Sequence, residues 1–353
     1  MAEKGAHANV MRNFVDNLQL VLSQIREGES QRDEKDEFDR QAYWNHIGTV
    51  FTAISNEATK LSMAFSKPPA PPPEHSQPMI TSLERATLAL VSAYYSFPKT
   101  QGVTLRKALK TAVLNIIESV RTLAQNIADY DLGSPEQLRA TGIVWHGADI
   151  LSSLPKDNQR ATLAIVEETA ELVRDALHEL QEALESEGQA DDLDELLIAD
   201  GFVMSNEDTW TDSDKEVLAA SMGLIKTVKS LLKKSKESVK QNAVCDTEAN
   251  IAQLDDLVDH LGNLSPAVDN LAASLYPPMV YPTIMKHTED LSACIEKYLQ
   301  FLKVPEITAL FRPVKIRVRI GLQQPMLAAL SHDRGGRPTM AGVPSQGQTT
   351  QPG

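Results

Sequence analysis

Apolar residues recur at spacings of three and four positions from about residue 8 to residue 303. This spacing places one apolar stripe along each of a series of α-helices, and the alternation typical of strands is almost absent over the same range. Proline and glycine clusters interrupt the pattern and divide it into separate helices. The sequence therefore predicts an all-α fold in which amphipathic helices bury their stripes against one another in antiparallel bundles.

The stripes are regular enough to name the expected core. The first helix carries Met11, Phe14, Leu18, Val21 and Ile25, and the second carries Trp44, Ile47, Phe51, Ile54, Ala58, Leu61 and Phe65. Ser134, followed by Pro135 and by Gln137 three positions after the serine, predicts the start of a later helix that contains Trp145. Heptads from Leu163 to Leu184 fit either a zipper for another chain or a seam inside the chain's own bundle, and we favour the seam.

An acidic stretch separates two runs of this helical pattern. Residues 182–216 contain thirteen acidic residues and a single lysine, Lys215, with few large apolar groups. Such a segment has little apolar surface to bury, which is typical of a solvated linker. We therefore expect an N-terminal helical bundle over residues 8–186, an acidic linker over residues 187–209 and a C-terminal bundle over residues 210–303.

The composition changes after residue 303. Residues 304–353 contain six prolines, six glycines and six Arg or Lys against Glu306 and Asp333, a net charge of +4. Residues 314–320 alternate like a strand, but no second segment is patterned to pair with them. We expect a basic, disordered C-terminal tail over residues 304–353 and a C-terminal bundle that lacks its last helix.

Charge and cysteine content narrow the function classes. The chain has 34 Lys plus Arg against 48 Asp plus Glu, a net charge of -14, which disfavours nucleic acid and anionic membranes and favours a basic protein surface as partner. Its two cysteines, Cys245 and Cys294, exclude a disulfide scaffold and fit a reducing compartment. No apolar run approaches the roughly 18 residues that a membrane span needs. We expect a cytoplasmic or nuclear protein.

Catalytic and metal-binding signatures are missing from the sequence. It has no HExxH pair, no cysteine spacing for zinc and neither of the glycine-rich phosphate motifs. The run Asp191-Asp192-Leu193-Asp194 is no calcium loop, because Leu197 stands at the sixth position from Asp192, where such a loop needs glycine. We expect no catalytic residue, no metal site and no cofactor, so that binding is the protein's chemistry.

Two short features remain as candidates for protein contacts. The run from Pro68 to Pro73 fits either a polyproline ligand for an SH3 groove or a loop between two helices. Ser205 and Ser213 each precede acidic residues, the pattern that an acidophilic kinase recognises, and are candidate phosphorylation sites. The residues that contact a partner are not identifiable from the sequence.

Several longer motifs follow one another in a fixed order. They are Glu37-Phe38-Asp39-Arg40 before Trp44, Glu57-Ala58-Thr59-Lys60-Leu61, Tyr94-Tyr95 with Pro98-Lys99-Thr100-Gln101-Gly102-Val103-Thr104-Leu105-Arg106-Lys107, Gln253-Leu254-Asp255-Asp256-Leu257-Val258-Asp259, Ser265-Pro266-Ala267-Val268-Asp269-Asn270-Leu271-Ala272 and Ser274-Leu275-Tyr276-Pro277-Pro278-Met279. With these motifs, and with Trp210 in its acidic surroundings, the chain resembles the vertebrate cyclin-D-binding family over about residues 10–303.

The resemblance implies both a fold and a function. It implies helical bundles of the talin, vinculin and α-catenin kind, in a protein of nucleus and cytoplasm. It also implies a negative regulator of cell-cycle progression that binds D-type cyclins and a signalling adaptor protein, and that restrains phosphorylation of the retinoblastoma protein and downstream transcription. The competing interpretation is a vinculin-type structural adaptor that links cytoskeletal or junctional partners through the same bundles.

The resemblance ends near residue 303. Members of the family close with a further amphipathic helix, whereas this chain continues with residues 304–353. An alternative exon and a gene model that reads through an intron would each explain the change.

Overall fold

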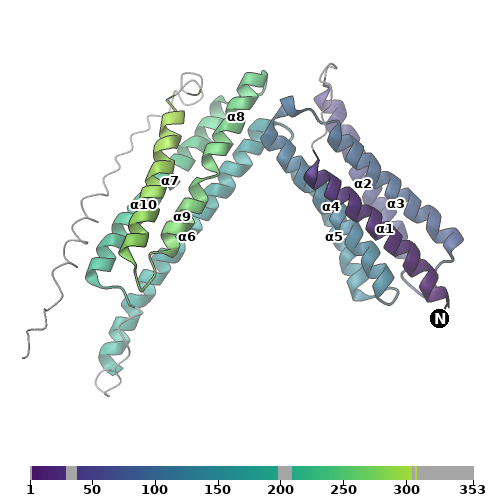
Figure 1. Cartoon of the computed structure of the whole chain (residues 1–353), viewed down its shortest axis with the longest axis horizontal. Coiled ribbons are helices and arrows are strands. Elements are labelled where there is room, and N and C mark those ends of the chain that lie inside the picture. Colours follow the sequence, from purple (N-terminus) through teal and green to yellow (C-terminus); the bar gives the residue numbers. More distant parts are fainter. Residues whose placement is uncertain (1, 29–37, 198–208, 304–306, 308–353) are drawn as a thin grey trace, which may run out of the picture. The chain divides into compact units, whose positions relative to one another are not determined.

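The computed structural model describes residues 2–28, 38–197, 209–303 and residue 307. In this part of the chain every regular element is helical, so the predicted all-α fold is confirmed (Figure 1). The α-helices are α1 (Ala2–Glu27), α2 (Arg40–Ala64), α3 (Pro73–Tyr95), α4 (Val103–Asp129), α5 (Pro135–Ser153), α6 (Asn158–Leu197), α7 (Asp212–Asn242), α8 (Glu248–Leu261), α9 (Leu264–Ala273) and α10 (Tyr281–Phe301), with a 3₁₀ turn η1 (Lys99–Gln101) before α4.

The chain divides into two compact units. The first contains the described residues up to 167, residues 236–259 and residue 307, and the second contains the described residues of 168–235 and 260–303. The predicted boundaries at residues 186 and 210 stay a prediction, although α6 continues to Leu197 and the predicted linker therefore starts inside a helix. Apart from Ile307, which is buried, the predicted tail lies outside the described residues.

Five helices of the first unit form a closed bundle. Helix α1 packs against α3 and α4, α2 packs against α3 and α5, and α4 packs against α5 (Figure 1). The helices therefore follow one another around the bundle in the order α1, α3, α2, α5, α4. Helices α2 and α5 run antiparallel, because the indole N–H of Trp44 near the start of α2 donates to the Lys156 carbonyl beyond α5, while Ser62 near the end of α2 meets Thr141 near the start of α5.

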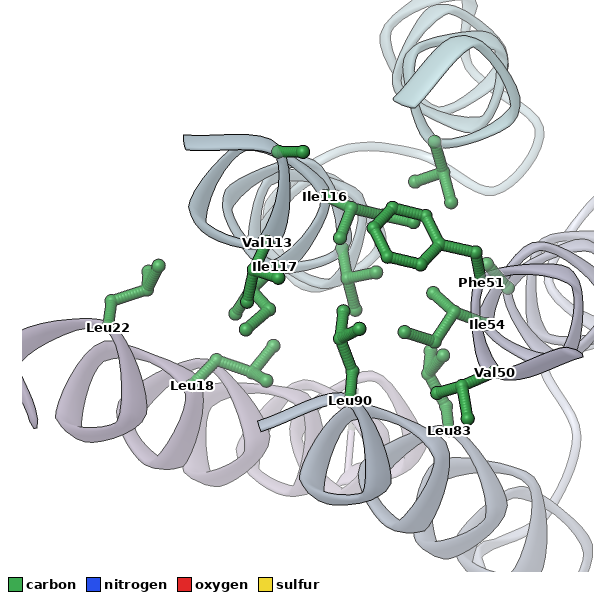
Figure 2. Packing of buried hydrophobic residues seen from close by; sticks show 14 of the residues in the cluster. Leu18, Leu22, Val50, Phe51, Ile54, Leu83, Leu90, Val113, Ile116 and Ile117 are labelled. Carbon is green, nitrogen blue, oxygen red and sulfur yellow. The ribbon is translucent and has the colours of Figure 1, made fainter. Parts of the chain in front are cut away.

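The core of this bundle is made by the predicted stripes. All seven residues of the Trp44–Phe65 stripe are buried, and so are Met11, Phe14, Leu18 and Ile25 of α1. Figure 2 shows Leu18 and Leu22 of α1 beside Val113 and Ile117 of α4 on one side of the core, and Phe51 and Ile54 of α2 on the other side, with leucines of α3 completing the cluster. Burying each such side chain contributes about 1.5–3 kcal/mol relative to leaving it in water, which explains why the helices close around this seam.

Local sequence signals set several helix ends. The Ser134 hydroxyl accepts a hydrogen bond from the Gln137 backbone N–H at 3.3 Å, so the predicted cap of α5 is confirmed. Asp39 caps α2 in the same way through Ala42. Helix α3 begins at Pro73, so the proline run forms the loop between α2 and α3.

The second unit also packs its stripes internally. On α6, the heptad residues Val173, Leu177 and Leu180 are buried within this chain, which supports the seam over the zipper for another chain. The hydroxyls of Ser235 on α7 and Tyr298 on α10 are hydrogen-bonded to each other in the core of this unit. A buried pair of this kind fixes the register of two helices, because neither hydroxyl has water as an alternative partner.

Candidate functional site

A partly buried acidic side chain caps helix α4 from a distant part of the chain. The carboxylate of Asp255, on α8, accepts hydrogen bonds from the Val103 N–H at 2.7 Å and from the Thr104 N–H at 2.9 Å. It also accepts one from the Thr104 hydroxyl at 2.7 Å. The residue before α4 is Gly102, which has no side chain to cap the helix, so Asp255 satisfies the free N–H groups of its first turn.

Asn158 completes this arrangement. Its side-chain oxygen accepts a hydrogen bond from the Leu105 N–H at 3.0 Å, and its amide nitrogen donates to Asp255 at 3.0 Å and to the Ile251 carbonyl at 3.2 Å. We call Val103, Thr104, Leu105, Asn158 and Asp255 the polar junction. Every polar group in it has a partner inside the first unit, so the junction positions the starts of α4 and α6 against α8 and offers no free group to a ligand.

Gly102 has a backbone that the junction requires. Its φ of 111° lies in a region that side-chain-bearing residues rarely adopt. A Cβ atom at this position would also lie 2.2 Å from the Asn158 side chain. Two motifs that are far apart in the sequence, Gly102-Val103-Thr104 and Leu254-Asp255-Asp256, therefore meet for structural reasons.

A second pair of motifs meets in the second unit. The indole N–H of buried Trp210 donates to the Leu275 carbonyl at 2.7 Å, and the Trp210 ring lies 6.1 Å from that of Tyr276. The hydroxyl of Tyr281 donates to Asp214 at 2.6 Å, and Asp214 in turn accepts from the Thr211 N–H at the start of α7. The Trp210 and Ser274–Met279 motifs thus stabilise the second unit. Because their side chains are used in this way, exposed apolar residues elsewhere are the better candidates for a surface that contacts partners.

Helix α5 presents such residues because its amphipathicity is inverted. It buries Gln137, Ala140, Thr141, Val144 and Gly147, which are polar or small. It exposes three large apolar residues: Leu138 is 60 % exposed, Ile143 48 % and Trp145 48 %. Large apolar residues are usually buried, so a helix that turns them outward marks a candidate interface.

The inverted orientation of α5 is fixed by hydrogen bonds in its seam with α2. The hydroxyls of Ser62 and Thr141 are 2.7 Å apart. The Gln137 side chain donates to the Ser62 carbonyl at 2.8 Å and accepts from the Gly133 N–H at 2.9 Å. Because these buried polar groups would lose their partners if α5 rotated, the helix cannot turn Leu138 and Trp145 inward without leaving them unsatisfied.

Trp145 is held in place across the same seam. Its indole N–H donates to the Thr59 hydroxyl at 2.8 Å, and that hydroxyl donates to the Ser55 carbonyl at 2.7 Å. One turn beyond Thr59 on α2, Met63 is 70 % exposed. We call Met63, Leu138 and Trp145, which flank this seam, the apolar patch.

The apolar patch has the chemistry of a protein-binding surface. Tryptophan dominates binding energy at many interfaces because it buries a large area on association. The hydrogen bond to Thr59 restrains the indole before binding, which lowers the conformational entropy that association costs. Between Leu138 and Trp145 stands Gly142, where a Cβ atom would meet nothing within 4 Å, so a partner can approach the helix backbone closely there.

Of the two predicted phosphorylation sites, the structure describes one. Ser205 lies outside the described residues. Ser213 is exposed in the first turn of α7, between Asp212 and Asp214. Phosphate at a helix N-terminus interacts favourably with the helix dipole, so this placement is compatible with modification.

Within the described ranges, no group of three or more His, Cys, Asp or Glu side chains is arranged to hold a metal ion. None of the helices in this part of the chain combines the length and the apolar character that crossing a membrane requires.

Two family models match the chain. The model described as "Grap2 and cyclin-D-interacting, N-terminal" matches residues 46–186, and the corresponding C-terminal model matches residues 189–300. The first match includes the apolar patch, and the second includes the Trp210 and Asp255 motifs. Together the two models cover most of the chain.

Curated relatives agree with these models. A Xenopus laevis protein named "Cyclin-D1-binding protein 1 homolog" is 40 % identical over 293 residues, which are 82 % of this chain and 87 % of that protein. The Danio rerio homolog of that name is 36 % identical over 85 % of this chain and 88 % of its own length. The Homo sapiens "Cyclin-D1-binding protein 1" is 30 % identical over 84 % of this chain and 86 % of its own length.

Proposed function

Because the chain belongs to the Grap2 and cyclin-D-interacting family, we propose that it is a non-enzymatic interaction protein that binds a D-type cyclin. Relatives from three vertebrates carry cyclin D1 binding in their names and align with most of their length. The observation that supports this proposal is therefore family membership over both units. The fold adds a compatible surface.

We place the cyclin contact on the apolar patch. Trp145 and Leu138 lie on the exposed face of α5, and Met63 lies on the neighbouring α2. All three are more exposed than large apolar residues in a folded domain usually are, and the seam between their helices holds them in place. Covering them on association would contribute the hydrophobic energy that specific binding needs.

The proposed consequence of binding is negative regulation of cell-cycle progression. A protein without catalytic groups acts by occupying a surface, and bound cyclin is withdrawn from other partners by mass action. On this proposal the chain restrains phosphorylation of the retinoblastoma protein and the transcription that depends on it. We also propose that it acts in nucleus and cytoplasm, binds a signalling adaptor protein and is phosphorylated at Ser205 and Ser213.

The test is a pull-down of purified D-type cyclin by the full chain. Trp145→Ala should weaken retention at least about tenfold, because truncating a central interface tryptophan costs about 2 kcal/mol or more. Leu20→Ala is the matched control, since Leu20 on α1 is also exposed, at 66 %, but lies outside the patch. Equal retention of cyclin by both variants would remove the patch from the proposal.

A second arm separates this function from that of a vinculin-type structural adaptor. The same amounts of full chain are sedimented with actin filaments instead of cyclin. Retention on filaments with no retention of cyclin would reverse the ranking of the two functions. Retention of cyclin alone supports the regulator.

A further inference from the structure

The exposed face of α7 carries an isolated basic stripe. Residues 225–242 contain six lysines and Glu237 as their only acidic residue, a net charge of +5 in a chain whose total is -14. Lys226, Lys229 and Lys233, all in the second unit, are exposed. We call these three residues the lysine stripe.

Helix geometry aligns the three side chains. Positions i, i+3 and i+7 fall within a sector of roughly 60° and span roughly 10 Å along the axis, at 3.6 residues per turn. The opposite face of α7 is buried through Leu224, Val228 and Leu231. The rotation of the helix is therefore fixed, and the lysine stripe faces solvent.

None of the three lysines has an acidic partner among the described residues. By contrast, Lys236, about one turn later on the same helix, forms a salt bridge with Glu167 at 2.9 Å. Three neighbouring ammonium groups without counter-charge repel one another and raise the local positive potential. An acidic ligand would relieve this repulsion.

We propose that the lysine stripe docks an acidic peptide segment of a partner protein. Lysine is a flexible point charge, and α7 contains no arginine to form the planar fork that recognises phosphate in a fixed geometry. It also contains no aromatic residue on which a nucleic-acid base could stack. Glutamate and aspartate side chains, which need only a nearby cation, match the stripe.

The distance over which the charges of the lysine stripe act distinguishes a short peptide from a larger polyanion as its ligand. At 0.1 M salt, charges are screened beyond about 10 Å, so a short peptide on α7 senses mainly the stripe. A DNA duplex or an anionic bilayer extends further and meets the acidic remainder of the chain, whose charge is -14 minus 5, or -19. Among the described residues of α7, no large apolar side chain is exposed to enter a membrane.

The proposal is independent of the proposed cyclin contact and is tested without a cyclin. The probe is fluorescein-labelled poly-glutamate, titrated into the full chain at low salt and followed by fluorescence anisotropy. The triple variant Lys226→Gln/Lys229→Gln/Lys233→Gln should bind at least about tenfold more weakly, as expected for three surface pairs. Replacing the same three lysines by arginine should preserve binding, because charge and not fork geometry is used.

A matched control variant removes the same number of positive charges from another surface of the second unit. Lys286, Lys297 and Lys303 are also exposed in the second unit, and replacing all three by glutamine should leave poly-glutamate binding within about twofold of the original. Helical circular dichroism verifies that each variant is folded. Equal weakening by both triple variants would show an unspecific charge effect and overturn the proposal.

Four results would contradict the proposal that the lysine stripe binds an acidic peptide of a partner. Absence of poly-glutamate binding overturns the proposal. So does stripe-dependent binding of duplex DNA or of phosphatidylserine vesicles in place of poly-glutamate. Dimerisation at low salt that depends on the lysine stripe, measured by light scattering, would show that the stripe binds an acidic segment of a second copy of this chain. That result would also overturn the proposal of a partner protein.

Discussion

Asp255 and Thr104 are joined by two hydrogen bonds although 151 positions separate them in the chain. One comes from the backbone N–H of Thr104 and the other from its hydroxyl, so a single carboxylate replaces the capping side chain that Gly102 cannot supply. Helix α8 is thereby tied to the start of α4 within the first unit. The two motifs that contain these residues meet at this contact.

Replacing Asp255 should therefore destabilise the first unit. Asp255→Ala leaves the Val103 and Thr104 N–H groups without their acceptor, and losing hydrogen bonds to a charged group costs about 2 kcal/mol. The measurement is chemical denaturation followed by circular dichroism. Asp269→Ala, at an exposed position of α9, is the control and should change stability by less than about 0.5 kcal/mol. Equal stability of the two variants would mean that the cap is not needed.

Two glycines of the first unit should respond to alanine in opposite directions. Gly102→Ala forces a side chain into a backbone with φ of 111° and against Asn158, which should cost about 1–3 kcal/mol or more. Gly142→Ala fills open space in the middle of α5 and should stabilise the protein by about 0.5–1 kcal/mol. Thermal midpoints of the two variants test both signs. A rise in the midpoint with Gly102→Ala would contradict the role given to Asn158.

Most of the helices could be predicted because their signal is local. The Trp44–Phe65 stripe, the Met11–Ile25 stripe and the Ser134 cap each depend on residues within a few positions of one another, and the structure confirms all three. The Asp255 cap could not be predicted in this way. An unsatisfied helix start accepts any nearby carboxylate, and the sequence does not say which of 48 acidic residues the fold brings there.

The orientation of α5 shows a different limit. Its sequence contains one face with Leu138 and Trp145 and another with Ala140, Val144 and Gly147, and the larger residues predict the wrong inner face. The buried hydrogen bonds of Gln137 and Thr141 to Ser62 decide the rotation instead. The helical pattern predicts Trp145 on a helix but does not predict that its side chain is exposed. An apolar pair at i and i+7, opposite small residues, is the signal that could have revealed it.

The stability of the first bundle should depend on core position and not on apolar character alone. Phe51 is 1 % exposed and lies in the seam shown in Figure 2, so Phe51→Ala should cost about 3–5 kcal/mol through lost transfer energy and a residual cavity. Met63 on the same helix is exposed, and Met63→Ala should cost less than about 0.5 kcal/mol. Differential scanning calorimetry compares the two. If Phe51→Ala kept its midpoint, the α2 stripe would not be a core seam.

Two buried tyrosines should make the fold sensitive to alkali. Burial raises the pKa of Tyr298, an effect that its hydrogen bond with Ser235 only partly offsets, and burial likewise raises the pKa of Tyr43 against the opposing field of Arg106. A tyrosine in the unfolded chain ionises near pH 10, whereas these two stay neutral in the folded protein. Their contribution to stability is therefore complete below about pH 10 and is lost as the pH rises through the raised values.

The expected size of this effect follows from proton linkage. Above about pH 10, each such tyrosine lowers the free energy of unfolding by about 1.4 kcal/mol per pH unit, because the unfolded state releases a proton that the folded state retains. Urea denaturation at a series of alkaline pH values measures the slope. Tyr298→Phe should reduce the slope by about that amount, since phenylalanine fills the same space without an ionisable group. Tyr130→Phe, at a residue that is 52 % exposed, is the matched control, and a slope in Tyr298→Phe as steep as in this control would contradict the assignment.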